Sequence, residues 1–236
     1  MVSGFEVVLP YLPRILKGAL LTVELAVLST ALAIIYGLIG ALMKTSESRV
    51  ARAIASLYST IVRGIPELVW ILFIFFGLKF SVQNIADQLE VVPVNISPFI
   101  AGSLTLAFIY GAYFTETFRG AMLAIPAGQL ETGRAYGMNG RQVFSRITFP
   151  QLMRYALPGI RNNWLVLVKA TAIVSVIGLD DMTRIAQQSG ASVGASFVFN
   201  CTSAILFLII TSISFTVFRR LEKTYNRGLK GFNYGK

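Results

Sequence analysis

Residues 19–43 read ALLTVELAVLSTALAIIYGLIGALM, and Glu24 is the one charged residue among them. An α-helix needs roughly 20 apolar residues to cross the hydrocarbon core of a bilayer, so this run is long enough to span a membrane. It is also too long for the apolar part of a secretory signal peptide, and no small-residue cleavage site follows it. The run therefore predicts a membrane-spanning helix that stays in the mature chain.

Four further apolar runs of comparable length follow, at residues 54–80, 97–118, 161–179 and 195–218. Of the 236 residues, 55% are hydrophobic and only 14% are charged, which is more apolar than a soluble domain requires. We therefore expect an all-α membrane protein in which residues 1–236 form one domain with five transmembrane helices.

The net charge of +10 would suggest a nucleic-acid partner if the chain were soluble. The positions of the cations favour a different interpretation, because they follow the first, third and fifth runs. The cations that follow the fifth run are Arg219, Arg220, Lys223, Arg227, Lys230 and Lys236. The opposite side holds few cations, together with the acids Asp87, Glu90, Asp180 and Asp181. By the positive-inside rule, we expect the amino terminus outside, the carboxyl terminus in the cytoplasm and no nucleic-acid partner.

Several functional classes lack the residues that they require. Cys201 is the only cysteine, which excludes an internal disulfide and a multi-thiol metal site, and the chain contains no histidine. No G-x-x-x-x-G-K-[ST] phosphate loop is present, so this chain has no site for ATP hydrolysis. We expect no cofactor here; in ATP-driven transport, ATP and Mg²⁺ would bind to a separate ATPase.

A polar segment, QLETGRAYGMNGRQVFSRITFPQL at residues 129–152, separates the third and fourth runs. Its first residues suit a short helix, and Gly137 and Gly140 can adopt positive φ and turn the chain. A helical pattern resumes at Arg141 and continues to Ile147, and Pro150 is expected to end it. The segment predicts a helical hairpin over about residues 129–150, on the cytoplasmic side.

The spacing of residues in this hairpin resembles the E-A-A–x3–G–x9–I–x–L–P signature of permease subunits in bacterial ABC importers. Two small residues stand where the signature has alanines, and Phe149 replaces its leucine. The resemblance implies that the hairpin is the coupling helix, which docks in a cleft of the ATPase. The residues that it assigns to ATPase coupling are Glu131, Thr132, Gly133, Gly137, Ile147 and Pro150.

The resemblance extends along nearly the whole chain. The segments IVRGIPELV, IYGAYFTETFRGAM, RYALPGIRNNW and LVKATAIVSVIGL are similar to the polar amino acid branch of these permeases, and closest to the histidine and lysine–arginine–ornithine importers. It implies a type I ABC importer permease fold in the bacterial inner membrane. The implied partners are membrane lipid, a second permease subunit, similar or identical, an ABC ATPase dimer and an external or periplasmic solute-binding protein. The implied function is import of polar, basic amino acids (arginine, lysine, histidine, ornithine) by alternating access, with glutamine or glutamate as alternative substrates.

Several polar side chains fall inside the predicted spans, where a charge costs about 2.5–3.5 kcal/mol near the bilayer centre. They should therefore face protein or water. The candidates for the substrate path are Glu67, Glu116, Asn163, Lys169, Thr171 and Ser175. Lys169 could bind the α-carboxylate of a substrate or pair with an acid on another helix. Polar side chains also hold helices together in bilayers, so a structural role is the alternative for each.

Three further interpretations concern charged residues near these candidates. Arg63 and Glu67 flank a break at Gly64 and Pro66, either as an ion pair or as part of a broken helix beside the pathway. The spacing of Glu116 and Arg119 favours a structural or gating pair. Glu24 is isolated, and we expect it to contact a neighbouring helix.

Two other classes of function were weighed against the permease. An intramembrane enzyme could use Glu67 or Glu116 as acid–base, but the lack of histidine and of any nucleophile–base spacing argues against it. An ion-coupled carrier usually has two related halves, which this sequence does not contain. The permease subunit of an ABC importer is therefore the favoured hypothesis.

Overall fold

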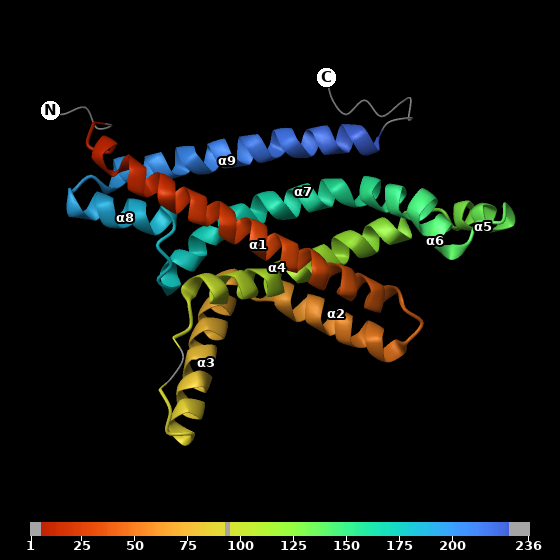
Figure 1. Ribbon diagram of the computed structural model, residues 1–236, viewed down its shortest axis with the longest axis horizontal. Coiled ribbons are helices and arrows are strands. Elements are labelled where there is room, and N and C mark those ends of the chain that lie inside the picture. Colours follow the sequence, from red (N-terminus) through yellow and green to blue (C-terminus); the bar gives the residue numbers. More distant parts are fainter. Residues whose placement is uncertain (1–5, 93–94, 227–236) are drawn as a thin grey trace.

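The computed structural model describes residues 6–92 and 95–226, and within these ranges every regular element is a helix (Figure 1). Five helical stretches in the described residues are long and apolar enough to cross a membrane, which confirms the predicted fold class. The long helices are α1 (Leu12–Thr45), α3 (Glu67–Gln88), α4 (Pro98–Leu123), α7 (Phe149–Val174) and α9 (Ser196–Tyr225).

Short helices connect the long ones. They are η1 (Leu9–Tyr11), α2 (Arg49–Gly64), α5 (Ala127–Ala135), α6 (Gly140–Val143), the π-helical turn η2 (Phe144–Thr148), η3 (Ser175–Ile177) and α8 (Met182–Ser192). Asp181, one of the acids on the predicted outer side, is the N-cap of α8 and accepts a hydrogen bond from the Arg184 backbone N–H at 2.9 Å. The terminal cations Arg227, Lys230 and Lys236 lie outside the described residues.

The centre of the molecule is the crossing of α1 and α4. Small residues allow this close approach, as is common between membrane helices. A Cβ atom on Gly37 would lie 2.9 Å from the backbone carbonyl carbon of Phe114, and one on Gly40 would lie 2.9 Å from Thr115 Cγ2. On another side of α4, Gly159 of α7 leaves room for the side chain of Thr117 in the same way. Helices α1, α4 and α7 therefore form one tightly packed unit.

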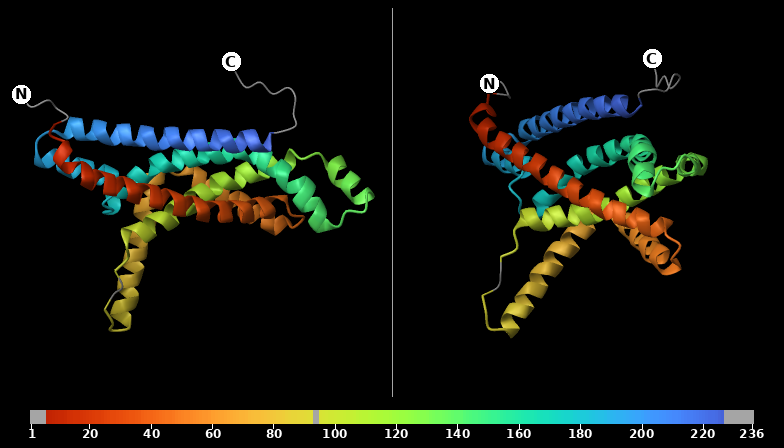
Figure 2. Two further views of the ribbon diagram at one scale, coloured as in Figure 1. Left: turned by 45° about the horizontal axis from the view of Figure 1, so that its top comes forward. Right: turned by 45° about the vertical axis from the view of Figure 1, so that its right-hand side comes forward.

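Helices α3 and α9 lie at the outside of this unit. Helix α9 runs along α7, whereas α3 projects away from the bundle in all three views (Figures 1 and 2). In each of them few side chains are buried: Phe199 and Ser203 in α9, and Ile71, Phe75 and Ala86 in α3. Their apolar surfaces are thus available to lipid or to another protein chain.

The predicted span at residues 54–80 is wrong as a single helix. Helix α2 ends at Gly64, and Ile65 is extended (φ −110°, ψ 138°) before Pro66. Proline disfavours helical geometry in the residue before it, which explains the break. The spanning helix is α3, which starts at Glu67 and continues past residue 80 to Gln88. The other four predicted runs each overlap one long helix.

Candidate functional site

The predicted hairpin is present and extends past the end of the packed helices (Figure 1). Helix α5 forms its first arm, and the chain turns at Gly137, whose φ is +78°. Nothing lies within 4 Å of a Cβ placed there, so backbone conformation, and not crowding, requires glycine. Gly140, the other expected turning residue, instead begins α6 without a positive φ. Asn139 caps α6 through a capping box with Gln142, with both hydrogen bonds at 2.9 Å.

The second arm differs from the prediction, because Pro150 does not end a helix. The chain passes from α6 through the π-helical turn η2 into α7, and Pro150 lies in the first turn of α7. Proline lacks the N–H that would bond to the preceding helical turn, and the π-helical turn η2, where the hydrogen bonding changes register, stands directly before it. The hairpin is therefore joined to a spanning helix without an intervening loop.

The coupling candidates divide into packed and exposed residues. Gly133 is buried against η2, where a Cβ atom would lie 2.6 Å from Ile147 Cδ1. An alanine at this position would require the Ile147 side chain to shift, so Gly133 and Ile147 mark where the two arms pack together. Glu131 and Thr132 are exposed, and Thr132 Oγ1 donates to the Gly128 carbonyl at 2.7 Å.

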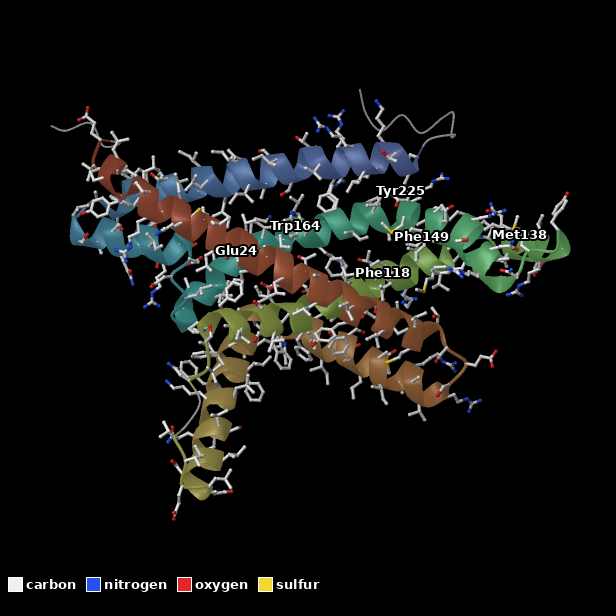
Figure 3. All side chains as sticks on the ribbon, in the orientation of Figure 1. Glu24, Phe118, Met138, Phe149, Trp164 and Tyr225 are labelled. Atoms are coloured by element: carbon white, nitrogen blue, oxygen red, sulfur yellow. The ribbon has the colours of Figure 1, made fainter. Side chains whose placement is uncertain are left out.

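Tyr136 was missed by the sequence analysis. It is 83% exposed at the tip of the hairpin, beside Gly137. A large aromatic side chain in a polar cytoplasmic segment was the available signal, since exposed tyrosines are enriched at protein interfaces. Met138 lies close by at the same end (Figure 3).

Glu116 connects three helices. Its Oε1 accepts a charged hydrogen bond from Lys44 Nζ, and its Oε2 lies 2.9 Å from Arg119 Nε. Lys44 also donates to Ser59 Oγ of α2 at 2.6 Å. The predicted pair with Arg119 is confirmed, whereas Lys44 was missed because it lies 72 residues away in the chain. Both carboxylate oxygens are engaged, so Glu116 serves here to hold α1, α2 and α4 together.

Glu67 lies in the first turn of α3, immediately after the helix break. Its Oε1 accepts a hydrogen bond from Tyr110 Oη at 2.9 Å. The Arg63 guanidinium instead stacks over the ring of Tyr113 at 5.2 Å. The expected ion pair between Arg63 and Glu67 is wrong: both residues are described and they form none. The chain is extended at Ile65 between α2 and α3, and the broken-helix interpretation is the one that remains.

Three polar candidates are buried in the protein, Asn163 and Thr171 on α7 and Ser175 in η3. Thr171 and Ser175 each donate to a backbone carbonyl three residues earlier, at 2.6 and 2.8 Å. Asn163 donates to Thr117 Oγ1 of α4 at 3.1 Å. These contacts satisfy the side chains inside the subunit, and that of Asn163 joins two helices.

Lys169 and Glu24 are exposed in the isolated chain (Figure 3 labels Glu24). Lys169 lines a cavity of about 480 Å³ between α7 and α9, together with Leu165, Thr211, Ser212, Phe215 and Thr216. No carboxylate of the described residues pairs with it. The expected contact of Glu24 with a neighbouring helix is not present within this chain, where the described residues give its side chain no hydrogen-bond or ion-pair partner. Charged groups at this depth do not face lipid, so each must meet water or a second chain.

The described residues contain no group of three or more His, Cys, Asp or Glu side chains that could hold a metal ion. The charged constellations of the spans are instead pairs and networks of acids with lysine, arginine or tyrosine. The contacts of this arrangement hold helices of the subunit together.

Five spanning helices with a short helical hairpin between the third and fourth define a permease subunit of the type I importer class. The chain belongs to the family of binding-protein-dependent transport system inner membrane components, whose model matches residues 13–230. In such a system the ATPase and the substrate-binding protein are separate chains, so this chain is a multi-pass membrane protein that works with both.

Among curated relatives, the chain is 47% identical to the histidine/lysine/arginine/ornithine transport system permease protein HisQ of Escherichia coli, covering 92% of this chain and 95% of that one. It is 39% identical to the octopine permease protein OccQ of Rhizobium radiobacter, covering 91% of each. It is 32% identical to the arginine permease protein ArtQ of Escherichia coli, covering 87% of this chain and 92% of the other.

Solved structures agree with this assignment. A crystal structure of an amino acid ABC transporter with histidines matches at a TM-score of 0.79 and 30% identity, covering 95% of this chain and 100% of the other. The methionine transporter MetNI, in an inward-facing conformation, matches at a TM-score of 0.69 and 19% identity, covering 92% and 99%. The second match concerns the fold alone.

Proposed function

We propose that this chain is the permease subunit of an ATP-driven importer of basic amino acids, and that its hairpin is the coupling element for the ATPase. The observation that carries the coupling role is the exposed hairpin, with Glu131 and Tyr136 free at its surface and its second arm continuous with α7. The substrate class is supported by the 47% identity to HisQ, whose name gives histidine, lysine, arginine and ornithine.

The mechanism is alternating access. The distribution of lysine and arginine supports a cytoplasmic hairpin and an amino terminus outside. ATP binding brings the ATPase subunits together and with them the hairpins of two permeases. The displacement passes from α5 to η2 through the contact of Gly133 with Ile147, and from η2 directly into α7. The pathway through the two permeases then opens outward to accept the substrate. Hydrolysis of ATP returns the transporter to its starting conformation.

A second permease subunit, similar or identical, completes the pathway. Its support is the set of surfaces that the described chain leaves uncovered, namely α3, α9 and the exposed charges Glu24 and Lys169. A charge without a partner at membrane depth is costly, so contact with a second chain or a water-filled path stabilises these residues.

For the substrate path, Glu67 and Lys169 are the strongest of the candidate residues. Glu67 has one carboxylate oxygen beyond its bond to Tyr110, and it follows a helix break where free backbone groups can meet a ligand. Lys169 supplies a cation without an acidic partner, which suits an α-carboxylate. Glu116 is assigned a structural role between helices, since both of its carboxylate oxygens already pair with cations of this chain.

The test is uptake by the whole complex in proteoliposomes. Glu131→Lys and Gly137→Asp should abolish uptake while the permease still inserts and assembles. Glu47→Lys is the matched control, since Glu47 is also exposed and lies on the loop between α1 and α2. Normal uptake by an assembled Glu131→Lys complex would reject the coupling role.

Competition with unlabelled arginine, histidine, lysine and glutamine tests the substrate class. Stronger competition by glutamine would reject the assignment of basic amino acids as the substrates.

A further inference from the structure

The hairpin carries a groove as well as an exposed tip. The groove has a volume of about 380 Å³ and lies between α5 on one side and η2 with the first turn of α7 on the other. It is lined by Gln129, Thr132, Gly133, Tyr136, Met138, Arg146, Ile147, Pro150 and Gln151. The Gln151 amide donates to Gln129 Oε1 on the opposite wall and to the Ile147 carbonyl at 3.1 Å. The groove is therefore held in shape by the hairpin itself.

Arg146 gives this groove a positive charge. Its side chain is exposed, and no carboxylate of the described residues pairs with it. Glu131 is the only acid between residues 127 and 151, and it does not line the groove. The same segment also holds Arg134 and Arg141, so its net charge is positive. A guanidinium group binds a carboxylate through two parallel hydrogen bonds, which a neutral partner cannot match.

We infer that the groove receives an acidic side chain, aspartate or glutamate, from the partner ATPase, with its carboxylate paired to Arg146. This inference rests on the proposed docking of the hairpin on the ATPase. The stem of the incoming side chain lies against the ring of Tyr136 and against Pro150, and its polar end meets Arg146 and the amides of the groove. Docking is then reciprocal: the hairpin inserts its tip into the ATPase and accepts a side chain in return.

Zero-length cross-linking tests this contact directly. A water-soluble carbodiimide joins a primary amine to a carboxylate that touches it, and arginine does not react. The Arg146→Lys variant of the assembled complex should therefore give a covalent permease–ATPase product, mapped by mass spectrometry to an aspartate or glutamate of the ATPase. Arg141→Lys is the matched control, because Arg141 is exposed on the same hairpin but does not line the groove. A product with Arg146→Lys no stronger than with Arg141→Lys or wild type, in an intact complex, would overturn the inference.

Affinity supplies a second measurement. Arg146→Gln should weaken association with the ATPase by about tenfold or more and reduce its salt dependence, because it removes one partner of a desolvated ion pair. Arg141→Gln should change the affinity much less. Equal effects of the two variants would count against the groove. If Glu131→Lys abolishes uptake while Arg146→Lys fails to cross-link, the coupling function stands and only the groove contact is rejected.

Discussion

Replacing Glu116 by glutamine removes the one acid that Lys44 and Arg119 share. The Lys44 side chain is 11% exposed and that of Glu116 is 23% exposed, so the variant leaves a nearly buried ammonium group without its counter-ion. Loss of one partner of a buried ion pair costs about 3–5 kcal/mol. Lys44→Met should cost less, because Glu116 keeps Arg119 as a partner. Arg119→Gln should cost less than about 1 kcal/mol, since the Arg119 side chain is 39% exposed and screened by solvent.

The assay is thermal unfolding of the purified complex, with the midpoint of each variant compared with that of the wild type under the same conditions. The double variant Lys44→Met/Glu116→Gln should be more stable than Glu116→Gln alone, because it no longer buries an unpaired cation. If the double variant loses the sum of the two single effects, the pair does not act as a unit and the reasoning fails. Equal losses for Arg119→Gln and Glu116→Gln would refute the ranking by burial.

Two further predictions concern packing and pH. Gly37→Ala places a methyl group against the backbone of Phe114 and should destabilise the chain by about 1–3 kcal/mol. Gly120→Ala, where nothing lies within 4 Å of the new methyl group, should be neutral or stabilising. Thermal unfolding measures both, and equal losses would contradict the close crossing of α1 and α4. Burial raises the pKa of the Asp181 carboxyl above its usual value, so the folded state favours the protonated acid, and stability should fall as pH rises from about 4 toward neutral. Asp181→Asn, which keeps an acceptor for the Arg184 N–H, should flatten that dependence in the same assay; an unchanged slope would contradict it.

The spans and the hairpin could be predicted because they depend on local composition. An apolar run such as residues 19–43 has few alternatives to a spanning helix, and the polar segment with Gly137 has to turn. Helix bounds were less predictable at prolines. Pro66 divides a run that hydropathy alone joins, whereas the helical chain continues through Pro150, where a simple rule would end it. The same residue type has opposite effects because its position within the turn decides which hydrogen bond is lost.

The contacts of the charged residues could not be predicted, because their partners are distant in sequence. Spacing indicates the pair of Glu116 with Arg119, but only the crossing of α1 and α4 brings Lys44 to the same carboxylate. Spacing also indicates a pair of Arg63 with Glu67, and the helix break removes it. Sequence reasoning thus identifies which charges need partners and does not identify the partners.

The continuity of the second arm with α7 limits where the subunit can bend. From Phe149 to Lys169 the chain is one helix, which at 1.5 Å per residue places Lys169 about 30 Å from the hairpin. A displacement of the hairpin therefore reaches the interior along a rod that has no loop in it. The rod can bend at η2, where the hydrogen bonding changes register, and at Pro158, which lacks a donor within α7. Gly159 and Asn163 hold α7 against Thr117 of α4 just beyond Pro158. Leu152 and Ala156 bury the part of α7 before Pro158 in the same core, so η2 is the point at which the hairpin can bend relative to the packed helices.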